Sequence, residues 1–278
     1  MSDWGGKNAV NILDDGEWWR LVTPIFLHAG IIHLLCNIAV QLETGAFFER
    51  EWGSTNWMII YLGSAVGSSV LSVICMPNSV SVGSSGAVMG LFGGKLAELI
   101  CRACESTKTP QDRVRHSVRK EQLGGTLCAV TLVMAFSFIP YGALYIFVVV
   151  VVVCVFYMLF WCILYICVYY IYYDSHNIYT AHTHTIQYNT VDWSAHLGGI
   201  VSGLVVGLPI FACDIKTRSW RILWFIVGTV LTIASFAWAF TYMYSGAIDP
   251  AEELRDVCGY YQQFFEDYEC HCMREEQE

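Results

Sequence analysis

Ser85 and His196 have side chains that can take part in catalysis, and each stands at the start of a segment that another helix can approach closely. Ser85 lies in a Gly-Ser-Ser-Gly stretch that precedes an apolar run, so its hydroxyl is expected at a helix N-terminus. His196 stands in the same way at the start of a second apolar segment. A serine hydroxyl in contact with an imidazole provides the nucleophile and the general base of acyl-transfer chemistry.

Small residues recur every four positions along both segments. This spacing leaves one helix face nearly free of side chains, and such faces let membrane helices pack closely. Each motif alone also has a purely structural interpretation, because small-residue faces are common in membrane helices. The matching positions of the serine and the histidine favour catalysis. The glycines predicted to form the two packing faces are Gly86, Gly90 and Gly94 in the first segment and Gly199 and Gly203 in the second.

The composition is typical of a protein that crosses a membrane several times. Of its 278 residues, 55% are hydrophobic and 14% are charged, and the mean hydropathy is +0.48. Soluble domains carry about a quarter charged residues. We therefore predict an all-α polytopic membrane protein. The net charge of -9 gives no indication of nucleic-acid binding, and the basic residues cluster beside apolar segments, where they report topology.

Apolar segments and charged loops predict the domain organisation. Two basic clusters, 102–120 and 216–221, are expected in the cytosol, and counting the crossings between them places Ser85 and His196 on the same, non-cytosolic side. The predicted spans are 26–48, 57–75, 85–100, 123–141, 193–213 and 224–244. The predicted parts are a tryptophan-rich interfacial loop over 1–25, a membrane core over 26–141 and 191–213, a cytosolic loop and additional C-terminal span over 214–244, and an acidic tail with three cysteines over 245–278.

The segment 142–190 does not fit this organisation. It opens with an apolar run too long for one span and without a turn between two. A single crossing there would put His196 on the side opposite Ser85. Its Val-, Tyr- and Ile-rich composition resembles translated non-coding sequence, such as a retained intron. His182 and His184 within it are not predicted to bind a metal, because a site needs three or four ligands.

Polar residues interrupt the first predicted span. Polar groups at membrane depth are costly, so they usually face a cavity or mark a functional site. His33 and Asn37 are four positions apart and share a helix face. Both are hydrogen-bond donors, and plain interhelical hydrogen bonding is the alternative interpretation. His28 precedes them and is expected in the same polar cavity.

Five short motifs stand out in the chain: Gly-x-Ser-Gly at 83–86, His-x-x-x-Asn at 33–37, Ala-His-x-x-Gly-x-x-x-Gly at 195–203, Trp-Arg at 19–20 and Glu-Arg-x-x-Gly at 49–53. Taken together, these motifs resemble the rhomboid family of intramembrane serine proteases. The resemblance implies a rhomboid-like helical bundle, and the additional C-terminal span is similar to that of eukaryotic secretase-type members. A membrane of the secretory pathway, or the plasma membrane, is then expected rather than the mitochondrion. Family members have a span before the Trp-Arg loop, so we expect this chain to be truncated at its N-terminus.

The residues indicate a mechanism, in which the resemblance assigns the oxyanion role to His33 and Asn37. Ser85 would attack the scissile carbonyl and His196 would take its proton, as a dyad without a third carboxylate. His33 and Asn37 would complete the oxyanion hole begun by the helix N-terminus, and His28 would order water. The expected substrates are single-pass transmembrane proteins, whose helix must unwind locally before attack. The expected partners are those substrates and the lipid bilayer, and neither a metal nor another cofactor is called for.

Two other functions remain open from the sequence. A catalytically incompetent rhomboid-like protein would bind transmembrane clients for trafficking or quality control, which the truncation and the insertion favour. The presence of both Ser85 and His196 favours the protease. A small-solute transporter would explain glycine-rich helices but not the matched positions of these two residues. Cys101 and Cys104 have no second pair, so no zinc site is predicted, and the tail cysteines are either disulfide-bonded or free.

Overall fold

The protein is helical throughout the part of the chain that the structure describes. Its only other regular element there is an isolated antiparallel β-bridge between Lys7 and Ser81. The predicted all-α class is confirmed. The predicted insertion 142–190, with His182 and His184, and the tail cysteines lie outside the described residues, so these predictions stand as they were. The computed structural model describes residues 2, 4–103, 110–137 and 192–248.

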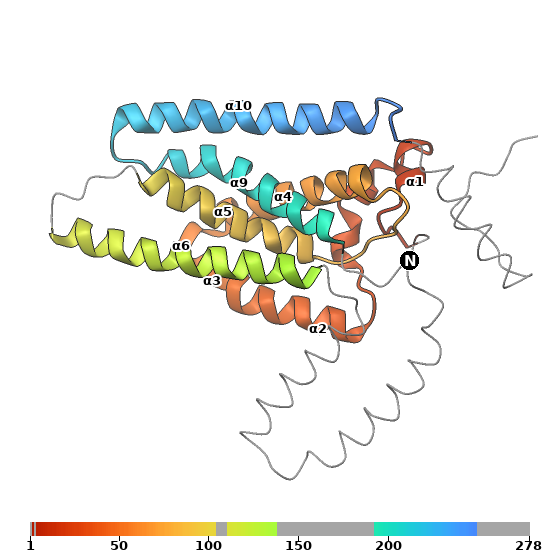
Figure 1. The fold of residues 1–278 in the computed structure, drawn as a ribbon, viewed down its shortest axis with the longest axis horizontal. Coiled ribbons are helices and arrows are strands. Elements are labelled where there is room, and N and C mark those ends of the chain that lie inside the picture. The colour runs from red at the N-terminus through yellow and green to blue at the C-terminus, as the bar shows by residue number, and fades with distance from the viewer. Residues whose placement is uncertain (1, 3, 104–109, 138–191, 249–278) are drawn as a thin grey trace, which may run out of the picture. The chain divides into compact units, whose positions relative to one another are not determined.

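Short helices open the chain and long ones follow (Figure 1). Among the residues that the structure describes, four segments are long and apolar enough to cross a membrane: Ile31–Trp52, Ser54–Cys75, Trp193–Ala212 and Arg218–Met243. The elements are α1 (Ala9–Leu13), the 3-10 helices η1 (Trp18–Leu21) and η2 (Thr23–Phe26), α2 (Ile31–Val40), the π-helical turn η3 (Gln41–Gly45), α3 (Ala46–Trp52), α4 (Ser54–Cys75), α5 (Ser85–Ala103), α6 (Pro110–Ser137), α9 (Trp193–Ala212) and α10 (Arg218–Met243).

The boundaries of two predicted segments were wrong. The first span begins at Ile31 rather than at residue 26, because Gly30 takes a φ of +98°, a conformation that glycine adopts readily and that precludes a helix. His28 consequently lies before the helix. The predicted basic loop 102–120 is helical from Pro110 onward, and proline suits the first position of a helix, where its missing N–H is not needed.

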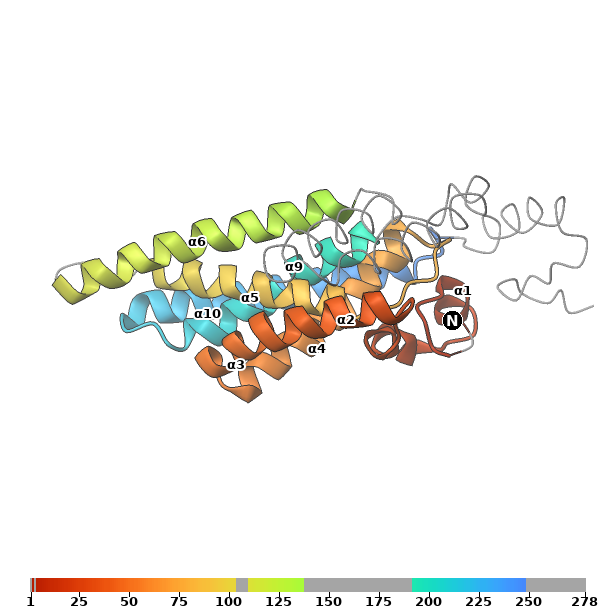
Figure 2. The ribbon, with the colours of Figure 1, turned by 90° about the horizontal axis from the view of Figure 1, so that it is seen from below.

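Helix α5 is enclosed by α4 and α9, and it runs beside α9 in both views (Figures 1 and 2). A Cβ on Gly199 would overlap the carbonyl group of Gly86, and a Cβ on Gly203 would overlap that of Gly90. The α9 glycines therefore bring the two backbones into contact, as the four-residue spacing predicts. Gly94 continues the row one turn further along α5, where a Cβ would lie 3.0 Å from Ile60 of α4.

The row of glycines on α5 has a second neighbour that the sequence did not indicate. A Cβ on Gly86 would overlap Ser68, and one on Gly90 would overlap Ser64, both of which belong to α4. The same small residues thus allow α4 and α9 to approach α5 from two directions. This packing fixes the rotation of α5 about its axis and therefore the direction of the residue at its N-terminus.

The N-terminal segment forms a folded layer at the Ser85 end of α5. Its apolar residues Ala9, Ile12 and Leu21 form a buried cluster with Val70 and Val73 of α4. The predicted interfacial loop is therefore a folded segment with short helices that packs against α4. Its tryptophans are exposed all the same, with 80% of Trp4, 67% of Trp18 and 44% of Trp19 accessible, as suits residues at a bilayer interface.

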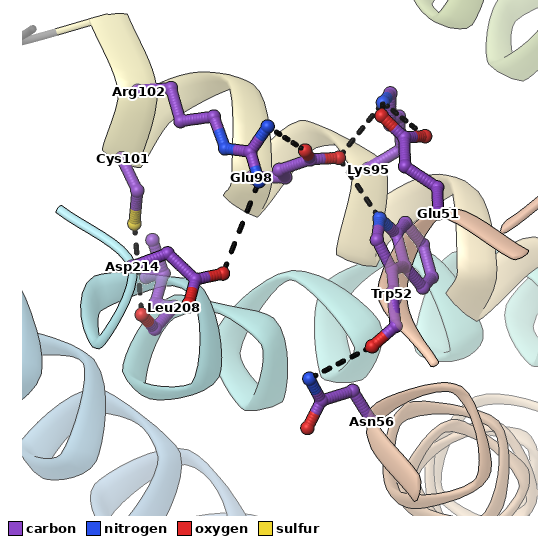
Figure 3. Close-up of polar contacts among 9 residues, drawn as sticks. All are labelled: Glu51, Trp52, Asn56, Lys95, Glu98, Cys101, Arg102, Leu208 and Asp214. Atoms are coloured by element: carbon purple, nitrogen blue, oxygen red, sulfur yellow. Dashed lines mark hydrogen bonds and ion pairs between the residues drawn. The ribbon is translucent and has the colours of Figure 1, made fainter. Parts of the chain in front are cut away.

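Two buried charged residues, Lys95 and Glu98, connect the second half of α5 to α3 (Figure 3). The Lys95 ammonium lies 2.8 Å from carboxylate oxygens of Glu51 and of Glu98. The second oxygen of Glu98 lies 2.8 Å from the Arg102 guanidinium, and the Trp52 indole N–H donates to Glu98 over 2.9 Å. These contacts link α3 to α5, and we refer to Glu51, Lys95, Glu98 and Arg102 as the buried ionic cluster.

Candidate active site

The structure brings Ser85 and His196 together, although 111 residues separate them in the sequence. Ser85 Oγ and His196 Nε2 lie 2.9 Å apart, within hydrogen-bonding distance. Ser85 is the first residue of α5, and His196 lies in the first turn of α9 with 5% of its surface exposed. Gly86, directly after Ser85, and Gly199, about one turn after His196, lie against each other through their backbones, so the helix packing sets the separation of the two side chains.

His33 lies over Gly83, two residues before Ser85. A Cβ on Gly83 would lie 2.8 Å from His33 Cε1, 3.0 Å from His33 Nε2 and 3.8 Å from Ser85 Oγ. Position 83 therefore requires glycine for two reasons: a side chain would collide with His33, and the backbone has a φ of +125°, which glycine adopts readily. His33 Nδ1 accepts the Ala29 N–H over 3.3 Å. A neutral ring with this contact carries its proton on Nε2, the ring nitrogen that lies beside Gly83.

Asn37 is buried and lies against Ser84, next to the serine expected to be the nucleophile. Its Nδ2 donates to the carbonyl oxygen of His33 over 2.9 Å, and its Oδ1 accepts the Ser84 hydroxyl over 3.2 Å. One of these bonds lies within α2 and the other joins α2 to the residue that precedes α5. Because an amide nitrogen has two hydrogens, one further donor is available for a bound oxyanion.

His28 joins this polar group from the loop before α2. Its Nε2 lies 3.5 Å from Ser84 Oγ, and its ring meets that of His33 edge to face at 5.3 Å. Burial lowers the pKa of His28 below its ordinary value of 6.5, because the charged form loses hydration. The imidazole is then neutral at physiological pH and can both donate to and accept from water.

Ser84 connects these groups, and the sequence analysis did not single it out. It is 2% exposed, and its hydroxyl lies between Asn37 and His28. Its carbonyl accepts the Val88 N–H over 3.0 Å, as expected of the residue that precedes a helix. Its place next to Ser85 in the glycine-flanked motif could have indicated a role in the site. Ser85 lies against His196, and Ser84 lies against Asn37 of α2.

A cavity of about 430 Å³ opens beside this group, between α2 and α4. Most of its wall is apolar, and its polar lining comes from His28, Asn37, Gln41, Tyr61 and Ser84. Gln41 Nε2 donates to the Tyr61 hydroxyl over 2.9 Å. A cavity of this size with several polar groups can hold water, which hydrolysis at a buried site requires. Tyr61 is a second residue that the sequence analysis missed.

The N-terminus of α5 adds backbone donors to the site. The first N–H groups of a helix have no partner within it, and they carry a partial positive charge. Because α5 begins at Ser85, these groups lie next to the Ser85 hydroxyl and favour a negative charge there. Among the described residues, no three His, Cys, Asp or Glu side chains are grouped so that they could hold a metal ion.

Comparison with known proteins assigns this part of the chain to a family. Residues 15–110 match the family model of the rhomboid domain. The chain carries a rhomboid domain. The matched residues include His28, His33, Asn37 and Ser85 but end before α9, so His196 joins the site through the geometry of the fold. With its apolar helices, a chain with this domain is an integral, multi-pass membrane protein.

Several curated proteins are similar to the rhomboid domain of this chain. RHOMBOID-like protein 4 of Arabidopsis thaliana is 41% identical over 95 residues, which cover 34% of this chain and 24% of the relative. RHOMBOID-like protein 6, mitochondrial, of the same plant is 43% identical over 96 residues, or 34% and 31% of the two chains. Rhomboid protease GluP of Bacillus subtilis (strain 168) is 40% identical over 91 residues, or 33% and 18%. The chain thus spans less than a third of these three relatives.

Proposed function

We propose that this chain is an intramembrane serine protease that cleaves transmembrane proteins with a dyad of Ser85 and His196. The observation that carries the proposal is the 2.9 Å contact between Ser85 Oγ and His196 Nε2, made at the ends of two closely packed helices inside a membrane bundle. Named rhomboid proteases among the similar proteins support hydrolysis as the reaction class.

The first half of the reaction uses the dyad as nucleophile and base. His196 Nε2 takes the proton of the Ser85 hydroxyl while Oγ forms a bond to the scissile carbonyl carbon. The carbonyl π electrons move onto its oxygen, which the α5 N-terminal N–H groups and the donors His33 Nε2 and Asn37 Nδ2 stabilise. The C–N bond then breaks, and His196 gives its proton to the leaving amine.

The second half returns the enzyme to its starting state. A water molecule loses a proton to His196 and attacks the acyl group on Ser85, and the ester bond breaks as the serine recovers its proton. The polar cavity beside His28 and Asn37 supplies this water. Substrates are proposed to be single-pass transmembrane proteins with helix-weakening residues near one end, since an intact helix keeps its carbonyls hydrogen-bonded.

Covalent labelling with a fluorophosphonate probe tests the proposal. In detergent-solubilised full-length protein we expect the probe on Ser85, located by mass spectrometry, and no labelling of Ser85→Ala or His196→Ala. Ser84→Ala is the matched control, because it removes the neighbouring hydroxyl and should keep the label on Ser85. Labelling that persists in Ser85→Ala would refute the assignment of the nucleophile. A folded wild type that takes up no probe would favour the alternative, a client-binding protein without protease activity.

The membrane in which the protein acts is also a proposal. We place it in the secretory pathway or at the plasma membrane, on the resemblance of its additional C-terminal span, α10, to secretase-type members. One similar protein is named mitochondrial. Imaging of the tagged full-length chain against organelle markers decides, and co-localisation with a mitochondrial marker would overturn this placement.

A further inference from the structure

The loop that leads into Ser85 is tied to the N-terminal segment at both of its ends. This loop, residues 76–84, joins α4 to α5 and contains no helix. Just past its middle, Lys7 and Ser81 exchange two backbone hydrogen bonds, of 2.9 and 3.1 Å. Near its end, the Gly83 N–H donates to the Pro24 carbonyl over 2.9 Å. The N-terminal segment therefore sets where the loop runs.

Lys7 holds this loop with its side chain as well. The residue is 1% exposed, and its ammonium donates to the Met76 carbonyl over 2.8 Å and to the Ser79 hydroxyl over 3.2 Å. Met76 follows the last residue of α4, where carbonyl groups lack helical partners and carry partial negative charge. A buried ammonium is tolerated only where it is hydrogen-bonded. The Lys7 ammonium therefore caps the C-terminal end of α4.

The contacts of Lys7 continue through the first half of the loop. Ser79 donates to the Met76 carbonyl with both its backbone N–H, over 3.2 Å, and its hydroxyl, over 3.0 Å. The hydroxyls of Ser72 and Ser81 lie 3.5 Å apart. Residues 76–81 therefore form one hydrogen-bonded unit around the ammonium, and four residues further along stands Ser85.

We infer that Lys7 is a positioning residue, which fixes the loop 76–84 and through it the placement of the Ser85 hydroxyl against His196. This inference rests on the proposed function. A displacement of about 1 Å between reacting groups can reduce a rate by about 10²-fold, so a loop held in one place matters for the reaction as well as for folding. Loss of the ammonium is expected to slow the reaction of Ser85 in molecules that are still folded.

The time course of fluorophosphonate labelling separates positioning from folding. At saturating probe, the final labelled fraction reports how much protein is folded, and the rate constant reports the reactivity of Ser85 in those molecules. We expect Lys7→Met to label to a similar final fraction at a rate lower by about tenfold, with an unchanged pH dependence. Ser79→Ala, which removes the hydroxyl acceptor of the Lys7 ammonium, should lower the rate by about threefold. Lys216→Met, at an exposed lysine between α9 and α10, should leave the rate unchanged.

A second readout does not depend on catalysis. Amide hydrogen exchange of residues 79–84 should become faster in Lys7→Met and in Ser79→Ala, and stay the same in Lys216→Met. A wild-type labelling rate in Lys7→Met would overturn the inference. If Lys7→Met does not accumulate as folded protein, Ser79→Ala decides, and a wild-type rate with unchanged exchange in that variant would overturn it as well. Absence of Ser85-dependent labelling in the wild type would instead count against the proposed function, while the exchange measurement still tests whether Lys7 holds the loop.

Discussion

Replacing Lys95 by methionine should destabilise the protein strongly, because it removes one side of the buried ionic cluster. Lys95 and Glu98 are 2% and 1% exposed, and the Lys95 ammonium contacts two carboxylates at 2.8 Å. The side chain of Glu51 is 26% exposed, so this carboxylate can recover hydration once its partner is gone. Glu98 cannot, and it would keep only the Arg102 guanidinium and the Trp52 indole as donors.

The magnitude follows from the burial of Glu98. Breaking a buried ion pair by removing one partner costs about 3–5 kcal/mol. Since Glu98 keeps two donors and Glu51 is partly hydrated, we expect about 3 kcal/mol for Lys95→Met, at the lower end of that range. Glu98→Leu should cost a similar amount. The double variant removes both charges together, so it should cost less than the sum of the single variants by at least about 2 kcal/mol.

Reversible unfolding in mixed micelles, or steric trapping in bicelles, gives the free energies of unfolding for this cycle. Arg50→Met is the matched control, because Arg50 is an exposed basic residue of α3, and it should change the free energy of unfolding by less than about 0.5 kcal/mol. A cost below about 1 kcal/mol for Lys95→Met, or additive costs in the double variant, would refute the view that the two charges stabilise each other inside the bundle.

Three further predictions concern the site and the N-terminal segment. Gly199→Val should force α9 away from α5 and reduce both the free energy of unfolding, by about 3 kcal/mol or more, and the labelling of the site; unchanged thermal stability would contradict the packing argument. His33→Ala and Asn37→Ala should each lower kcat on a transmembrane reporter by about 10²–10³-fold, and a normal kcat would exclude the residue as an oxyanion donor. The hydrogen bond from Arg20 lowers the pKa of Glu17 from 4.5, so its carboxylate stabilises the folded state above pH 4.5. This contribution should disappear as the pH falls through the lowered value. Comparing the unfolding of wild type and Glu17→Gln across pH checks this, and a gap independent of pH would argue against it.

The juxtaposition of Ser85 and His196 could be anticipated because glycine spacing carries information about distance. A helix face without side chains has few functions other than close approach, and two such faces in one chain are natural partners. Position along each helix then follows from the residue number alone. For this reason the contact between two side chains that are 111 residues apart could be predicted from the sequence. The catalytic roles of the two residues remain predictions.

Spacing alone does not say which neighbours a helix has. The glycine row on α5 also faces Ser64 and Ser68 of α4, and nothing in the sequence of α5 distinguishes one partner from two. The start of α2 was misplaced for a related reason, since apolar content extends across Gly30 although its backbone conformation does not continue a helix.

Buried polar residues were the hardest to predict. Lys7 lies in a segment that is polar by composition, and its acceptor Met76 is 69 residues away, so no local pattern marks it as buried. Lys95 and Glu98 are three positions apart on α5, a spacing that indicates a side-chain pair. It does not indicate that the pair is enclosed, because burial depends on where α3 packs.

Proteolysis by purified protein in liposomes tests the central claim most directly. The full-length chain is reconstituted with a single-pass transmembrane reporter, and the cleaved bond is located by mass spectrometry. The proposed dyad predicts cleavage within or next to the reporter's membrane segment by the wild type and by Ser84→Ala. It predicts no cleavage by Ser85→Ala or His196→Ala when these variants are equally folded. Cleavage at the same bond by folded Ser85→Ala, or a well-folded wild type that cleaves nothing, would contradict it.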